Sequence, residues 1–290
     1  MPTYPRVKDK SLTRDPDSTF APKQYSNGLP LRWTHRALVN AGQSVAGTRL
    51  AYLTTGDSTA GLNAVPLGAL FQRAMGGRRG TYLLGATINA SSGLTTVTDY
   101  TLWPGAVHRV TGSVTYGVGS GSPICDTIKV YYFRDGAATF KVQVDGVDEA
   151  GYTNVATAGT GQIGVITLTK TRAAHTVTVV VLSGSLSLAG PGFEDSTTNG
   201  YVVGTTGVSG AEMRGWIDSA TVRTNLTTFV ADFAPTLCTV EMKEETGVDD
   251  AAFAADFATY LGLLAATVTT GDVLAWTSNP SQDATSDATV

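Results

Sequence analysis

One serine in this sequence stands where an enzyme nucleophile could stand. Ser58 lies in the stretch TTGDSTAG, after the strand-like alternation of Arg49–Thr54 and before apolar residues at helical spacing, which are Leu67, Leu70, Phe71 and Met75. This pattern predicts a tight strand-to-helix turn, where a hydroxyl lies beside unpaired backbone N–H groups. Gly-Asp-Ser is also an ordinary loop tripeptide, and Asp57 could simply cap the helix. Ser58 is therefore either a nucleophile or a residue of a structural turn.

The composition limits the classes of protein to consider. The 290 residues are 42% hydrophobic and 15% charged, with a formal net charge of −4. The length suggests about two domains, and the low charge with abundant Thr, Ala and Gly is typical of β-rich extracellular or virion proteins. No basic patch points to nucleic acid. We expect no secretory signal peptide and no membrane-spanning segment, because no apolar run is long enough.

The cysteines and histidines give no sign of a bound metal. The two cysteines, Cys125 and Cys238, lie far apart in the sequence, and two are too few for a disulfide framework. We expect two free thiols and leave a single disulfide between them as the alternative. No spacing of Cys and His is typical of zinc. The sequence therefore predicts neither a metal nor another cofactor.

The periodicity of apolar residues divides the chain into three parts. Residues 1–46 are rich in proline and predict an extended arm, with a short helix near THRALVNAG, that needs a neighbouring surface to become ordered. Residues 98–194 alternate with period two between Gly, Asp and Ser turns, which predicts an inserted β-sandwich. Residues 47–97 and 195–290 predict one discontinuous α/β domain. Its buried strands are expected at RLAYLT, GTYLLGAT, GYVVGTT, TLCTVEM and DVLAWTS.

Helices are predicted in the second half of the α/β domain. One apolar face runs through Met213, Trp216 and Ile217 and is continued by Leu226, Phe229, Val230 and Phe233. A second amphipathic helix has its apolar face at Phe253, Phe257, Tyr260, Leu261 and Leu264, with acidic residues at its N-terminal end.

Several of these segments resemble sequence blocks of the SGNH, or GDSL-like, hydrolases. TTGDSTAG resembles the first block, in which Ser58 would be the nucleophile. GYVVGTTGVSGAEMRGW resembles the second block and places Gly210 where that family has a glycine whose backbone N–H serves the oxyanion hole. The resemblance covers residues 47–97 and about 195–282. It implies a flavodoxin-like three-layer α/β fold and acyl transfer by an activated serine.

Two further blocks of that family are altered or missing. The third block keeps its buried strand, PTLCTVEM, but the next loop reads KEETG, with Lys243 at the glycine position and Glu245 at the asparagine position. A glutamate there offers no donor and repels a developing oxyanion. The fourth block, Asp-x-x-His, is not found, and His35, His108 and His175 fall in the arm and the inserted part. Either the natural protein continues beyond this sequence to that block, or the domain has kept its shape and lost its chemistry.

The inserted part resembles the small sandwiches of carbohydrate-binding modules. Sugar sites in such modules need exposed aromatic rings, and Tyr131, Tyr132 and Tyr152 are the candidates for substrate binding. The alternative is that these rings belong to the core or to edge strands.

The arm, the insertion and the altered hydrolase blocks together resemble minor tail proteins of phages that infect actinobacteria. The resemblance implies an extracellular virion tail location and a structural, host-envelope-binding role. The arm would bind other tail proteins, the domains would bind an envelope glycan or lipid, and the protein would form homo-oligomers. The alternative is an active serine esterase that deacylates cell-wall glycans or lipids with Ser58 and a downstream Asp-x-x-His.

Overall fold

The computed structural model describes most of the chain after the first 33 residues. The described residues are 34, 36–37, 39–40, 48–56, 78–82, 88–99, 101–117, 124–207, 213–242 and 250–277. Leu31–Val290 forms one compact unit, and Met1–Pro30 is assigned to a separate unit that lies outside the described residues. Thr34, Arg36, Ala37, Val39 and Asn40 are helical, which agrees with the short helix predicted there. Thr34 is buried, and its backbone N–H donates to Asp272 Oδ2 at 2.8 Å.

In the part of the chain that the structure describes, five parallel strands form one half of the fold. They are β1 (Arg49–Gly56), β2 (Arg78–Tyr82), β12 (Gly200–Thr205), β13 (Leu237–Met242) and β14 (Asp272–Thr277). Their spatial order is β14-β13-β1-β12-β2, and every neighbouring pair is parallel. β1 is buried from Leu50 to Gly56, so both faces of the sheet are covered at this central strand, as its near-continuous apolar run predicts. β2 begins two residues before the predicted strand GTYLLGAT and ends at Tyr82.

Among the described residues, three helices pack against one face of this sheet. They are α3 (Met213–Asp218), α4 (Ala220–Phe233) and α5 (Asp250–Thr267). Their apolar residues join Ala51, Leu53, Cys238 and Val240 of the strands in one buried cluster. The single apolar face predicted from Met213 to Phe233 is divided at Ser219, because the Ser219 hydroxyl accepts from the Val222 N–H and caps α4.

Nine strands of the described residues form the antiparallel half of the fold. They are β3 (Ile88–Thr98), β4 (Ala106–Tyr116), β5 (Ile124–Arg134), β6 (Thr139–Val144), β7 (Val147–Asp148), β8 (Val155–Ala156), β9 (Gln162–Ala174), β10 (Val177–Ser183) and β11 (Leu186–Glu194). The strand set β4-β10-β6 and the strand set β11-β5-β9 enclose a second apolar cluster. β3 pairs with β4 from Ile88 to Thr98, so the antiparallel strands begin earlier than residue 98.

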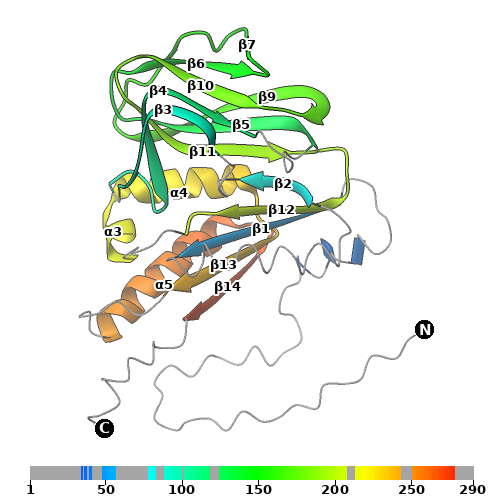
Figure 1. The fold of residues 1–290 in the computed structure, drawn as a ribbon. Helices are drawn as coiled ribbons and strands as arrows, with labels where there is room; N and C mark the ends of the chain where they lie inside the picture. Colours follow the sequence, from blue (N-terminus) through cyan, green and yellow to red (C-terminus); the bar gives the residue numbers. More distant parts are fainter. Residues whose placement is uncertain are drawn as a thin grey trace, which may run out of the picture. The chain divides into compact units, whose positions relative to one another are not determined.

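The parallel and antiparallel halves share apolar core. β11 pairs with β2, which makes the two sheets continuous. Trp103, Tyr131 and Phe133 of the antiparallel half belong to the same buried cluster as Phe229 and Phe233 of α4. In Figure 1, α4 is drawn between β11 and β12, at the level of β2. The antiparallel half therefore has an apolar cluster of its own and also contributes to the cluster that contains α4 and the parallel strands.

Candidate functional site

The strands that precede the three hydrolase-like segments lie side by side. β1 lies between β12 and β13, with Thr54 opposite Thr205 and Gly56 opposite Glu241. The chain therefore leaves these three strands at one edge of the sheet (Figure 1). In doubly wound sheets, ligands bind outside the carboxyl ends of the strands, where neighbouring connections diverge.

The predicted site residues themselves lie outside the described residues. Ser58 follows the end of β1 by two positions, Gly210 follows β12 by five, and Glu245 follows β13 by three. Lys243 also lies outside the described part of the chain. The roles of Ser58, Gly210 and Glu245 thus remain predictions. The structure shows that the strands preceding these residues in the sequence are neighbours in the sheet.

Hydroxyl groups connect the described ends of β1 and β12. The Thr206 hydroxyl donates to Thr55 Oγ1 at 2.8 Å, and Thr55 Oγ1 lies 2.5 Å from the Tyr260 hydroxyl of α5. Thr55, Thr206 and Tyr260 are all buried. Burial raises the pKa of Tyr260 far above its ordinary value, so its hydroxyl stays neutral at any physiological pH.

A buried carboxylate at this edge was not singled out from the sequence. Glu241 is 4% exposed and, among the described residues of the parallel strands, is the one buried carboxylate. Burial raises the pKa of Tyr52, and the nearby charge of Glu241 adds to that rise. The available signal was an acidic residue inside the apolar run TLCTVEM.

The two described histidines belong to the antiparallel half. His108 Nδ1 lies 3.0 Å from Thr96 Oγ1, and burial lowers its pKa. His175 Nδ1 lies 2.7 Å from Asp145 Oδ2, and His175 Nε2 lies 2.7 Å from the Thr171 carbonyl oxygen. Both therefore have partners within antiparallel strands and turns. His35 lies outside the described residues.

The candidate sugar-binding aromatics are mostly interior. Tyr131 is fully buried, 5.2 Å from Phe229 between ring centroids, and its hydroxyl donates to Asp232 Oδ2 at 2.6 Å. Tyr132 is 5% exposed and meets Phe140 edge-on. These two tyrosines lie in the core, which was the alternative to sugar binding. Tyr152 is half-buried and packs beside the second apolar cluster.

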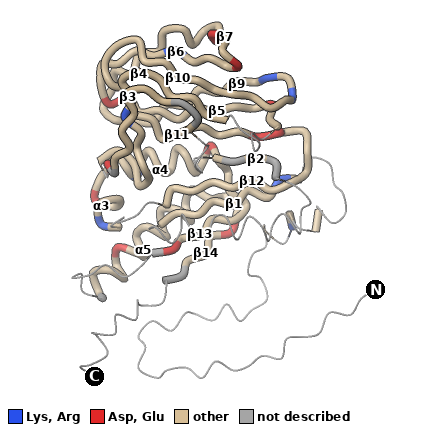
Figure 2. The backbone as a smooth tube through the Cα atoms, viewed as in Figure 1, with Lys and Arg blue, Asp and Glu red and all other residues tan. Residues whose placement is uncertain are grey.

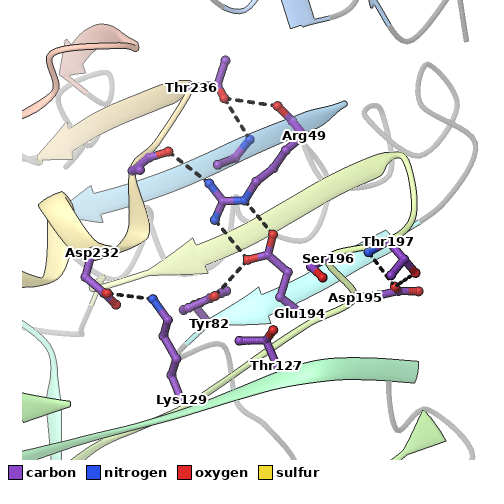
Figure 3. Close-up of polar contacts among 12 residues, drawn as sticks. Arg49, Tyr82, Thr127, Lys129, Glu194, Asp195, Ser196, Thr197, Asp232 and Thr236 are labelled. Carbon is purple, nitrogen blue, oxygen red and sulfur yellow. Dashed lines mark hydrogen bonds and ion pairs between the residues drawn. The ribbon is translucent and has the colours of Figure 1, made fainter. Parts of the chain in front are cut away.

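A polar cluster lies at the opposite, amino-terminal end of β1. Arg49 Nε contacts Glu194 Oε1 at 2.8 Å, and the Tyr82 hydroxyl donates to Glu194 Oε2 at 2.9 Å (Figure 3). Nearby, Lys129 Nζ and the Tyr131 hydroxyl both reach the carboxylate of Asp232. These contacts join β1, β2 and β11 and tie β5 to α4. We interpret them as structural, because they lie at the far end of β1 from Gly56.

The described residues hold no group of three or more His, Cys, Asp or Glu side chains placed to bind a metal. No described helix is both long enough and apolar enough to span a membrane. Charged residues are scattered along the described tube in Figure 2 rather than gathered on one element. Both cysteines are buried free thiols, which confirms that expectation.

Comparison with known proteins gives a structural likeness only. No family model matches the sequence, and no curated protein matches it. A solved structure of a peptidoglycan O-acetylesterase superposes with a TM-score of 0.57 and 18% identity, over 84% of this chain and 70% of that one. Residues 98–194 make up one third of this chain. A match over 84% of the chain therefore includes parts of both the parallel and the antiparallel half.

Other solved structures match more weakly. A family two carbohydrate esterase from Clostridium thermocellum in complex with cellohexaose gives a TM-score of 0.25 at 9% identity, over 66% of this chain and 77% of that one. A carbohydrate-binding module of family 35 from Paenibacillus barcinonensis gives 0.25 at 14% identity, over 35% of this chain and 92% of that one. The fold is thus an SGNH-hydrolase-like α/β half combined with an antiparallel β half, as the sequence predicts.

Proposed function

We propose that this protein recognises acylated glycans of a cell envelope through an SGNH-type site at the ends of β12, β1 and β13. The observation that supports the proposal is the order of these three strands, whose carboxyl ends lie side by side and are followed in the sequence by the segments containing Gly210, Ser58 and Glu245. The peptidoglycan O-acetylesterase of similar fold supports an acylated glycan as the ligand class.

The proposed role is binding rather than hydrolysis. Hydrolysis by this type of site requires an attacking hydroxyl, a base and oxyanion donors. Loss of one oxyanion donor costs on the order of 10²–10³ in rate, and a carboxylate at Glu245 adds repulsion. The described histidines have partners in the antiparallel half, and neither lies on a parallel strand. A site so composed would hold an acyl ester without cleaving it efficiently.

Active ester hydrolysis is the second candidate. It is favoured by the match to the peptidoglycan O-acetylesterase, which extends over both halves of the fold. On this reading Ser58 attacks the acyl carbonyl, and the base comes from an Asp-x-x-His segment downstream in the natural protein.

The setting that we propose is the tail of a phage virion, and this rests on the sequence alone. The Thr-, Ala- and Gly-rich composition is typical of virion proteins, and the proline-rich arm suits docking along other tail proteins. In that setting several copies would present their strand-end sites to a host envelope.

A paired binding and hydrolysis assay separates the two candidates. Purified protein is incubated with O-acetylated peptidoglycan and with the same material after mild base treatment, which removes the acetyl groups. We expect preferential sedimentation with the acetylated material, and near-background hydrolysis of 4-nitrophenyl acetate that is equal in wild type and Ser58→Ala. A clear loss of rate in Ser58→Ala would establish the esterase instead. Equal binding to both glycans would refute acyl recognition.

A further inference from the structure

Two chain segments that build the proposed site begin from residues joined by side-chain and backbone hydrogen bonds. The Thr206 N–H donates to the Thr54 carbonyl at 3.0 Å, which extends the β1–β12 pairing by one bond beyond Thr205. The Thr206 hydroxyl donates to Thr55 Oγ1 at 2.8 Å. Thr206 is therefore bound to β1 through both its backbone and its side chain.

Tyr260 extends this connection to the helix layer. Its hydroxyl lies 2.5 Å from Thr55 Oγ1, so Thr55 is hydrogen-bonded on both sides, to β12 through Thr206 and to α5 through Tyr260. Tyr260 is fully buried, and its ring lies 5.4 Å from that of Trp216 in α3, measured between centroids. α3 begins three residues after Gly210.

The sequence positions of these hydroxyls connect them to the site. Thr55 is three residues before Ser58, and Thr206 is four residues before Gly210. Chains of three and four residues span at most about 11 and 14 Å, so a shift of either anchor residue is passed to the segment that follows it. A hydroxyl network without exposed members is rigid, because each buried donor or acceptor that loses its partner costs the desolvation of that group.

We propose that Thr55, Thr206 and Tyr260 are positioning residues that fix the spacing between the Ser58 and Gly210 segments. They do not contact the ligand. They act by holding the end of β1, the start of the segment after β12 and α5 in one arrangement. The inference rests on the proposed function, because it assigns to these hydroxyls the preorganisation of that same site.

The test uses hydroxyl removal with restoration. Thr55→Val and Tyr260→Phe keep the shape of each side chain and remove the hydroxyl, and Thr55→Ser restores it. Thr178→Val is the matched control, because Thr178 Oγ1 lies 2.9 Å from Thr115 Oγ1 across β4 and β10 in the antiparallel half. Amide hydrogen exchange is followed in peptides covering residues 57–65 and 207–212 of the full chain.

We expect Thr55→Val and Tyr260→Phe to accelerate exchange in both peptides by about tenfold, the effect of losing one net hydrogen bond. Thr55→Ser and Thr178→Val should leave both peptides as in wild type. The preference for acetylated over base-treated peptidoglycan should also fall in Thr55→Val and Tyr260→Phe and stay as in wild type in the other two variants. Any kcat for 4-nitrophenyl acetate should change in the same way, with KM unchanged.

Two results would overturn the proposal. One is exchange within twofold of wild type in both peptides for Thr55→Val and Tyr260→Phe. The other is failure of Thr55→Ser to restore what Thr55→Val changes. If wild type shows no acyl preference and no turnover, the proposed function fails, whereas the exchange pattern still decides whether these hydroxyls hold the two segments.

Discussion

Asn225 of α4 accepts a hydrogen bond of 2.8 Å from the backbone N–H of Ile163 in β9, wholly inside the protein. Its amide nitrogen donates to the carbonyls of Leu102 and Gly161, each at 2.8 Å. One side chain of the helix layer thereby completes the backbone hydrogen bonding of two segments of the antiparallel half. The interface between the halves is thus specified by polar groups as well as by apolar contact.

Replacing Asn225 with Leu should destabilise the whole protein. The substitution keeps similar volume but leaves one N–H and two carbonyls without their partner, at about 1–3 kcal/mol each. We expect the free energy of unfolding in urea to fall by about 3–5 kcal/mol. The exposed neighbour Thr224, changed to Ala, serves as the control and should alter it by less than about 0.5 kcal/mol. A loss below 1 kcal/mol for Asn225→Leu would contradict the proposed interface role.

The parallel strands could be predicted because their chemistry is local. Runs such as RLAYLT and TLCTVEM are apolar on both faces. Such a run predicts a strand that is buried on both sides, without indicating which elements bury it. The strand order then follows from pairing that no single segment encodes. Alternation in β5 likewise indicates which side of the strand is buried, but not that Tyr131 packs on α4 rather than facing a sugar.

The break between α3 and α4 shows a second limit. The apolar positions from Met213 to Phe233 fit one helical stripe, and the stripe continues across Ser219. The helix nevertheless restarts there, because the serine hydroxyl satisfies the Val222 N–H at an extended backbone conformation. An N-cap hydrogen bond stabilises the start of a new helix by about 1 kcal/mol. The spacing of apolar residues gives no information about this hydrogen bond.

Removing the hydroxyl of Tyr131 tests whether this ring is core or ligand site. Tyr131→Phe loses the 2.6 Å bond to Asp232, which keeps its ion pair with Lys129 at 2.7 Å. We expect a loss of about 1–2 kcal/mol in the free energy of unfolding and no change in affinity for peptidoglycan. Tyr152→Ala is the comparison, since Tyr152 is only half-buried. Weaker glycan binding by a fully folded Tyr131→Phe variant would show that this ring belongs to the ligand site.

The stability contributed by His175 should depend on pH. Burial alone would lower the pKa of His175, but its bonds to Asp145 and the Thr171 carbonyl raise it overall. A carbonyl only accepts, so Nε2 donates to it, and the ring is doubly protonated when Nδ1 also donates to Asp145. Lys170 opposes this charge, and Glu149 is paired with that lysine.

The direction of the pH dependence of stability follows from the directions of the two pKa shifts, those of His175 and Asp145. Burial would raise the pKa of Asp145, but its bonds from Thr176 and His175 lower it overall. The histidine contribution is complete below the unfolded pKa of about 6.5 and is lost as pH rises through the higher folded value. The aspartate contribution is present above about pH 3.9 and is lost as pH falls through its lowered folded value.

We therefore expect His175→Gln to be less stable than wild type by about 1 kcal/mol near pH 5, since Asp145 is half-exposed and solvent screens the pair. The difference should shrink towards pH 9. Urea unfolding of both proteins at each pH measures it. A difference that grows with pH would mean that the histidine is neutral in the folded protein.

The two thiols report whether the halves of the fold unfold together. Cys125 lies in β5 and Cys238 in β13, and burial raises the pKa of each to about 12. Neither should react with a thiol reagent at pH 8 in the native protein, because access and thiolate are both lacking.

Because Tyr131 and Phe133 share one buried cluster with Phe229, Phe233 and Cys238, we expect one cooperative unfolding step. In Cys125→Ser and Cys238→Ser, the remaining thiol should become reactive at the same urea concentration in pulsed labelling. Labelling of Cys125 at a clearly different concentration from Cys238 would show that the antiparallel half opens independently, and that the contacts of α4 with β5 and β9 do not couple the two sheets.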